Sequence, residues 1–399
     1  RPQRKVTVIG SGQTRPEEPY DFVHAGCITR ERFQKWPKFP LLRSDYMYEE
    51  LTFASNLLRR YRASDFDATL TCAYPFTNWA LRWKGRKQKT PHLFVTQNGD
   101  WPARRTNSEY RLFSCDGLVC TNIEYFERHQ ENWRSALIPN GVDIERFQPR
   151  TGNRSLFAVP ENLPIVLMVN ALIPSKRVIE GIEMVAQRKD LALVIAGDGP
   201  MAPQVDERGQ TLLGDRYCRL TVRPEQMPGL YQSADVLLHM SQVEPFGNIY
   251  IEALASELPV VAHSTANTRW IFEDRGILVD TSSAEEVLSG ITHALGADED
   301  TRRNYRELAI RRFSWSVIAA AYSQFIDEIK NAGNAYGLNF WKLISINCRT
   351  NSHRENSRTN YCANATMPWS QKSSCLPPRK ARREPHPKKL SSSCGKNRD

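Results

Sequence analysis

Residues 241–255 constrain the fold of this chain more than any other segment. An apolar run at 236–239 precedes the segment and a second one at 259–262 follows it, so the segment connects two predicted strands. Its own pattern predicts a helix that begins near Gly247. A strand, a helix and a second strand of this length predict a parallel pair in an open α/β sheet.

Two carboxylates flank the start of that predicted helix. Glu244 precedes the helix, and Glu252 lies inside it, one turn beyond Asn248 and on the same face. The carboxyl ends of parallel strands form the usual ligand edge of such a sheet, and a helix N-terminus favours a phosphate group. Since carboxylates accept hydrogen bonds from sugar hydroxyls, the pattern indicates a nucleotide-sugar site. The alternative is an amphipathic helix with a solvated glutamate at each end.

The same alternation of strands and helices extends along most of the chain and predicts two doubly wound α/β domains, 1–148 and 149–313. A closing helix is expected over 314–330, with Ser314 as its N-cap. Strands are expected in the second domain at 165–169, 191–196, 220–222, 236–239, 259–262 and 276–279. Weaker runs in the first domain predict strands at 6–9, 68–72, 93–96, 118–120 and 137–138.

The positive charge of the chain is concentrated at its C-terminal end. Residues 331–399 hold 13 Lys and Arg against 3 Asp and Glu, whereas the rest of the chain holds 41 of each. Asn, Ser, Arg, Lys and Pro dominate this tail, and strand patterns are missing from it, so we expect disorder. The electrically balanced body argues against a basic face for nucleic acid, and we expect no specific nucleic-acid partner.

Several motifs occur together in a recognisable order. IPNGVD stands at 138–143, LVIAGDGP at 193–200 and EPFG at 244–247. The glutamate of the last motif, Glu244, precedes Glu252 by eight residues. Together they resemble the retaining GT-B glycosyltransferases of family GT4. The resemblance implies two Rossmann-like domains facing a cleft, with the nucleotide sugar on the second and the acceptor on the first. It also implies retaining hexosyl transfer from a nucleotide-diphosphate sugar, without a metal or other cofactor.

The resemblance also implies roles for individual residues. Lys176 matches the family's diphosphate-binding lysine, and Arg177 would add a second cation because Ala171 stands where the family has arginine. Glu244 would bind the donor sugar and Glu252 the ribose. The candidate catalytic residues are Glu244, Lys176 and Arg177, and the candidate donor-binding residues are Glu252, Phe246, Gly247, Asn248 and Gly199.

Candidate acceptor contacts follow two strands of the first domain. Asn98 and Asp100 come directly after the strand expected at 93–96, and Trp79 follows the preceding strand. An ordinary turn of Asn-Gly-Asp type is an equal alternative for the first two.

The chain departs from the family pattern at two informative places. Glu257 stands where a glycine normally supplies a left-handed cap after the helix. Residues 4–10 resemble the family's second strand, so we expect the first β-α unit to be absent. The alternative function is therefore a catalytically impaired nucleotide-sugar-binding protein with a truncated acceptor domain.

The remaining signals concern partners and location. No apolar window is long enough for a transmembrane helix, and the nine cysteines lack metal-type spacing, which favours a reducing, cytoplasmic compartment. The expected partners are a nucleotide-sugar donor and a glycan or lipid acceptor, with peripheral membrane contact left open. The acidic triplets at 65–67 and 298–300 are interpreted as surface acids, and His239 and His263 as core or edge residues. No metal site is expected.

Overall fold

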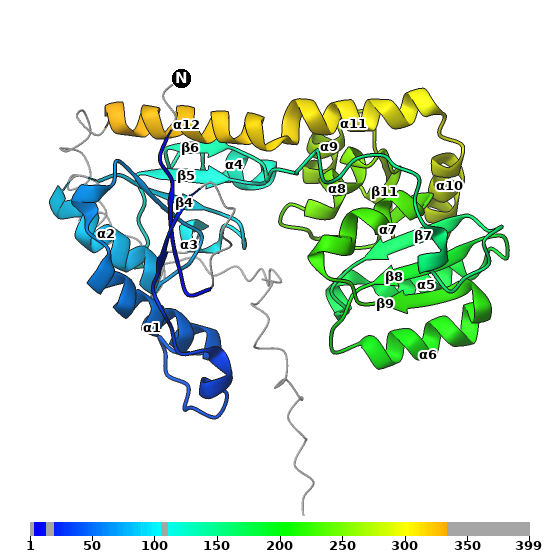
Figure 1. Cartoon of the computed structure of the whole chain (residues 1–399), viewed down its shortest axis with the longest axis horizontal. Coiled ribbons are helices and arrows are strands. Elements are labelled where there is room, and N and C mark those ends of the chain that lie inside the picture. Colours follow the sequence, from blue (N-terminus) through cyan, green and yellow to red (C-terminus); the bar gives the residue numbers. More distant parts are fainter. Residues whose placement is uncertain (1–3, 13–19, 89, 105–110, 333–399) are drawn as a thin grey trace, which may run out of the picture. The chain divides into compact units, whose positions relative to one another are not determined.

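The computed structural model describes residues 4–12, 20–88, 90–104 and 111–332 (Figure 1). The tail expected at 331–399 lies outside these residues, except that its first two residues belong to the last helix. Among the described residues, no helix is both long enough and apolar enough to cross a bilayer.

The second domain is built on six parallel strands in the order β12-β11-β10-β7-β8-β9. The first strand of the series, β7, therefore pairs with β8 on one side and with β10 on the other, so the winding reverses between β7 and β10. Ligands of open α/β sheets bind at such a switch point. The strands are β7 Ile165–Val169, β8 Ala192–Ala196, β9 Tyr217–Leu220, β10 Val236–His239, β11 Val260–His263 and β12 Ile277–Val279.

Helices connect these strands as the sequence predicts. They are α5 Val178–Val185, α6 Ala202–Leu213, α7 Met227–Ser233, α8 Asn248–Ala255, α9 Ala266–Phe272, α10 Ala284–Leu295 and α11 Glu299–Phe313.

One strand of the second domain differs from its prediction. The apolar run at 220–222 indicated a strand, but β9 is Tyr217–Leu220, which ends where the run begins. The reason is that β9 lies at the edge of the sheet and mixes polar with apolar side chains, so it lacks a continuous apolar run. Arg219 forms an ion pair with Asp206 of α6, and the Tyr217 ring packs against the same helix at Gly209.

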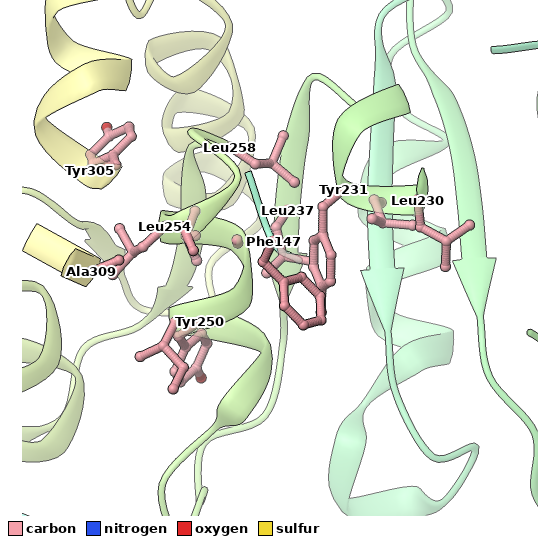
Figure 2. Close-up of a cluster of buried hydrophobic side chains, with 14 of the residues drawn as sticks. Phe147, Leu230, Tyr231, Leu237, Tyr250, Leu254, Leu258, Tyr305 and Ala309 are labelled. Atoms are coloured by element: carbon pink, nitrogen blue, oxygen red, sulfur yellow. The ribbon is translucent and has the colours of Figure 1, made fainter. Parts of the chain in front are cut away.

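Both faces of this sheet are buried, which explains the apolar runs of its strands. Ile165 and Leu167 of β7 face one core, and Val166 and Met168 face the other. The first core includes rings and aliphatic side chains from the helices and connecting segments on that side (Figure 2). They include Phe147, Tyr231, Tyr250, Leu254, Leu258, Tyr305 and Ala309.

The first domain contains a four-stranded parallel sheet in the order β3-β4-β5-β6. The last helix, α12 Trp315–Ala332, packs on it through Ile318, Phe325 and Ile329. Ser314 precedes α12 as expected, and its hydroxyl lies 3.1 Å from that of Ser316. The strands are β3 Thr69–Thr71, β4 His92–Val95, β5 Gly117–Cys120 and β6 Ser135–Leu137; the helices are α1 Asp45–Arg60, α2 Phe76–Gln88, α3 Trp101–Arg104 and α4 Ile123–His129.

The strand expected at 6–9 does not join that sheet. Instead, β1 Thr7–Gly10 pairs in parallel with β2 Asp21–His24, which the sequence did not indicate, to form a separate two-stranded sheet. Asp21 and His24 give β2 too little apolar pattern to be recognised. Arg4 anchors the start of this pair to α12 by an ion pair with Asp327.

Although glycine is replaced after α8, the backbone there is still left-handed, because Glu257 has φ = +60°. An L side chain in this conformation costs ~1–2 kcal/mol, and glycine avoids most of that cost. We predict that Glu257→Gly raises the free energy of unfolding by about 1 kcal/mol, partly offset by the greater freedom of the unfolded chain. Urea unfolding measures the change.

Glu207→Gly serves as the matched control. Glu207 is exposed inside α6, where glycine should lower stability by about 1 kcal/mol. Equal destabilisation by both substitutions would contradict the assignment of strain to Glu257.

Candidate functional site

An open pocket of about 420 Å³ lies at the carboxyl edge of the second sheet, a size typical of small-molecule sites. It spans the switch point between β7 and β10, and its wall is formed by the ends of β7, β8 and β10, the segment after β9 and the start of α8. The lining residues are Val169, Asn170, Ala171, Lys176, Ala196, Gly197, Asp198, Thr221, Val222, Met227, His239, Glu244, Gly247, Asn248 and Ile249.

Lys176 and Glu244 form an ion pair in this pocket. Lys176 ends a short 3₁₀ turn, Pro174–Lys176, that follows β7, and its ammonium group donates to Oε2 of Glu244. Each side chain is 18% exposed. Burial raises the pKa of Glu244, but the hydrogen bond from His239 and the charge of Lys176 outweigh it and hold that pKa at about 2.

His239 is the second partner of the same carboxylate oxygen. It ends β10, is 1% exposed, and its Nε2 lies 3.3 Å from Oε2 of Glu244. Its ring packs edge-on against Tyr250 of α8, with ring centroids 5.2 Å apart. Oε2 has two donors, whereas none of the described residues donates to Oε1, which stays available to a ligand.

The start of α8 is shaped by a glycine. Gly247 has φ = +95°, and a Cβ there would lie 2.4 Å from the Tyr250 ring, so no other residue fits without displacing that ring. The first amides of α8, at Asn248 and Ile249, have no acceptor within the helix and lie at the pocket wall. Such amides bind anions.

Glu252 and Phe246 differ from Glu244, because neither lines the pocket. Glu252 accepts a hydrogen bond from the Tyr231 hydroxyl at 2.7 Å, and its pKa is raised by burial although that bond lowers it. Phe246 was expected to bind the donor, and this role stays a prediction. Its ring is 3% exposed and packs against Phe313, so it belongs to the core.

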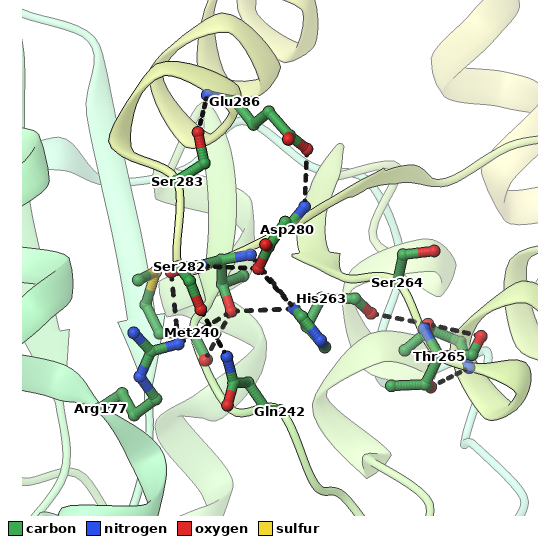
Figure 3. Close-up of polar contacts among 12 residues, drawn as sticks. Arg177, Met240, Gln242, His263, Ser264, Thr265, Asp280, Ser282, Ser283 and Glu286 are labelled. Carbon is green, nitrogen blue, oxygen red and sulfur yellow. Dashed lines mark hydrogen bonds and ion pairs between the residues drawn. The ribbon is translucent and has the colours of Figure 1, made fainter.

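Arg177, expected to supply a second cation, has its own partners in the structure. It adopts φ = +53°, a conformation that glycine tolerates best, and its guanidinium bonds Glu180 and the carbonyl and hydroxyl of Thr281. Figure 3 shows this side chain directed at the loop that contains Asp280 and Ser282. Arg177 therefore joins α5 to the loop after β12 and does not line the pocket.

Gly199 acts through its backbone. It has φ = +154°, and a Cβ there would lie 2.6 Å from the Leu172 carbonyl oxygen. Its amide donates to the side chain of Asp198 at 2.8 Å, and Asp198 lines the pocket.

The three acceptor-side candidates have different environments. Asn98 is exposed, as an acceptor contact requires. Asp100 is buried and binds Arg128 and, at 2.9 Å, His129, so its carboxylate is occupied in joining α3 to α4. Trp79 is half-buried against Tyr74, and its Nε1 has no hydrogen-bond partner among the described residues.

Several pocket residues were not predicted from the sequence, and they share one signal. Asn170, Asp198, Thr221 and His239 are polar residues at or just after the end of a strand. Asn170 is the least satisfied of them, because both of its amide atoms are buried without a partner among the described residues. The described part of the chain contains no cluster of three or more potential metal ligands.

The comparisons with known proteins agree with this geometry. Residues 150–312 match the family described as glycosyl transferases group 1. Over 195 residues the chain is 34% identical to a GDP-mannose-dependent alpha-mannosyltransferase of Mycolicibacterium smegmatis, covering 47% of this chain and 48% of that protein. It is 28% identical over 245 residues to a GDP-mannose-dependent alpha-(1-6)-phosphatidylinositol dimannoside mannosyltransferase of Mycobacterium tuberculosis, covering 59% of this chain and 62% of that protein.

A solved structure supports the fold. The glycosyltransferase from Rickettsia africae superposes with a TM-score of 0.62 at 17% identity, covering 82% of this chain and 90% of that one. This likeness establishes the GT-B fold expected from the sequence. The matches to the two mannosyltransferases span only about half to three fifths of their length.

The buried ion pair makes stability depend on pH in a specific direction. The folded pKa of Glu244 is about 2 and its ordinary value is 4.5, so the folded state binds fewer protons between these values. Its contribution of up to ~3 kcal/mol is fully present above pH 4.5 and is lost as pH falls towards 2. We predict that the stability difference between the wild type and Glu244→Gln shrinks over that interval in urea unfolding.

Glu207→Gln is the control, because Glu207 is exposed. A difference between wild type and Glu244→Gln that stays constant from pH 7 to pH 2 would contradict the ion pair.

Proposed function

Because residues 150–312 belong to the glycosyl transferases group 1 family, we propose that this protein transfers a hexosyl group from a nucleoside-diphosphate sugar to a hydroxyl acceptor. The observation that carries the proposal is the meeting of Lys176, Glu244 and the start of α8 in one pocket at the switch point. The mannosyltransferase relatives use GDP-mannose by their names, which makes it the first donor to test.

The pocket supplies the charge that this reaction needs. Departure of a nucleoside diphosphate concentrates negative charge on its phosphates, and preorganised cations and amides that face this charge lower the barrier. Lys176 and the first amides of α8 are the groups in position to do so. Because Lys176 is paired with Glu244, the incoming diphosphate competes with that carboxylate for the ammonium group.

The competition for Lys176 also indicates a role for Glu244. A diphosphate that draws Lys176 towards it leaves Glu244 held by His239 alone, and both carboxylate oxygens can then accept hydrogen bonds from sugar hydroxyls. Glu252 lies one turn beyond Asn248, the first residue of α8, with one oxygen taken by Tyr231. Its other oxygen is the one we assign to the ribose.

The proposal includes two further features of the reaction, namely retention of the anomeric configuration and independence of a metal. Retention of the anomeric configuration rests on the resemblance of Glu244 and Glu252 to the family signature. Metal independence rests on the assignment of the diphosphate charge to Lys176 and the helix amides, which leaves a metal no required task.

The acceptor is a hydroxyl of a glycan or a lipid, bound by the first domain, and exposed Asn98 is the best-placed of the three candidates. A lipid acceptor entails peripheral contact with a membrane. The second candidate function is binding of the nucleotide sugar without transfer. The separation of β1 and β2 from the four-stranded sheet of the first domain favours it.

Mass-spectrometric screening of UDP-, GDP- and ADP-sugars, with and without EDTA, tests the proposal. We predict binding and slow hydrolysis of one donor, unaffected by EDTA. Lys176→Ala should lower the turnover roughly 100-fold, as expected for the loss of one electrostatic stabiliser. Exposed Lys189 provides the control, and Lys189→Ala should have no effect.

The outcomes of the screen separate the candidates. Binding without hydrolysis or transfer would favour the second function. No binding of any donor would contradict both.

His239 permits a sharper test of the carboxylate. Glutamine can donate from the position of Nε2, whereas leucine cannot, so His239→Gln should retain sugar-dependent turnover and His239→Leu should lower it about tenfold. Binding of the free nucleoside diphosphate should be retained in His239→Gln and weakened in His239→Leu, because in the leucine variant Glu244 keeps no donor once the diphosphate draws Lys176 away. Calorimetry and turnover measure the two effects. Equal activity of the two variants would exclude a positioning role for His239.

A further inference from the structure

The segment before α1 presents an apolar surface that the proposed reaction does not use. We call residues 30–43 the Trp36 loop; in Figure 1 it belongs to the dark blue part of the chain that leads into α1. Three of its large apolar side chains lie largely in solvent: Trp36 is 52% exposed, Phe39 54% and Leu41 45%. Clusters of exposed rings on one loop are typical of interaction surfaces.

Packing against buried rings fixes the conformation of the loop, so the exposure of these side chains is a feature of the folded chain. Phe33 and Tyr48 are both buried, and Trp36 packs edge-on against them at centroid distances of 5.0 and 5.5 Å. The Tyr48 hydroxyl donates to the Pro37 carbonyl at 2.5 Å. Reciprocal backbone bonds between Phe39 and Leu42 close a turn at the tip.

Cations alternate with the apolar side chains. The loop contains one acidic residue, Glu31, and five exposed basic residues, of which Arg30 pairs with Glu49; the five are Arg30, Arg32, Lys35, Lys38 and Arg43. This loop therefore carries a local positive charge within a body whose total charge is balanced.

We propose that the Trp36 loop docks the protein onto an anionic phospholipid bilayer. Tryptophan and other rings favour the membrane interface, and each lysine or arginine near an anionic leaflet adds attraction. The rings at the tip and the flanking cations match these two requirements on one loop. The proposed contact is peripheral, because it is made by side chains of one surface loop.

Docking deepens the proposed function, because it presents the first domain to a lipid-linked acceptor. Only the biological use of docking rests on the proposed function; the docking itself does not. Vesicle binding is measured without a donor and without transfer, so its failure leaves the glycosyl-transfer proposal standing, and the reverse also holds.

The test is co-sedimentation of the full chain with phosphatidylcholine vesicles that contain or lack phosphatidylglycerol. We expect binding to the anionic vesicles, and roughly tenfold weaker partitioning for the double variant Trp36→Ser, Phe39→Ser. A second double variant, Lys35→Gln, Lys38→Gln, should also weaken binding, and more so at low salt. The basic tail is identical in all variants, so it contributes equally to each.

Trp83→Ser is the matched control. Trp83 is 64% exposed on α2, and its neighbour Lys84 bonds the carbonyls of Leu58 and Tyr61 at the opposite end of α1 from the loop. The control should bind like the wild type. Unchanged binding of the Trp36→Ser, Phe39→Ser variant would overturn the proposal, even if the lysine variant binds more weakly, because the contact would then be electrostatic alone.

Discussion

The pocket of the second domain depends on the partners of one carboxylate. A buried carboxylate without compensation is strongly unfavourable, so Glu244 requires both the ammonium of Lys176 and the ring of His239. These three residues come from the turn after β7, the end of β10 and the loop before α8. Tyr250 packs on His239 and against Gly247, which couples the start of the helix to the same cluster.

Much of this arrangement follows from the sequence, because parallel strands buried on both faces leave an unmistakable apolar run. The predicted ranges for β7 and β10 are those of the structure, and Glu244 and Gly247 lie where the helix start was expected. Glu257 adopts the left-handed conformation that glycine normally supplies at this position, since a backbone requirement at a helix end does not depend on distant residues.

Features that depend on tertiary contacts could not be predicted in the same way. A sequence shows that Phe246 and Asp100 stand near the two predicted sites, but not that one side chain turns into the core and the other is held by His129. Arg177 follows Lys176 directly, yet the left-handed backbone directs it to Thr281. His239 ends an apolar run, so a core position was the simpler interpretation, and only its distance to Glu244 shows its role.

The central claim is that Lys176 exchanges the carboxylate of Glu244 for the diphosphate of a donor. A crystal structure of the protein with a bound nucleoside diphosphate tests this most directly. The account predicts phosphate oxygens within hydrogen-bond distance of the Lys176 ammonium and of the first amides of α8, with the Lys176–Glu244 contact lengthened or broken. A diphosphate bound elsewhere, or an intact ion pair beside an occupied pocket, would contradict it.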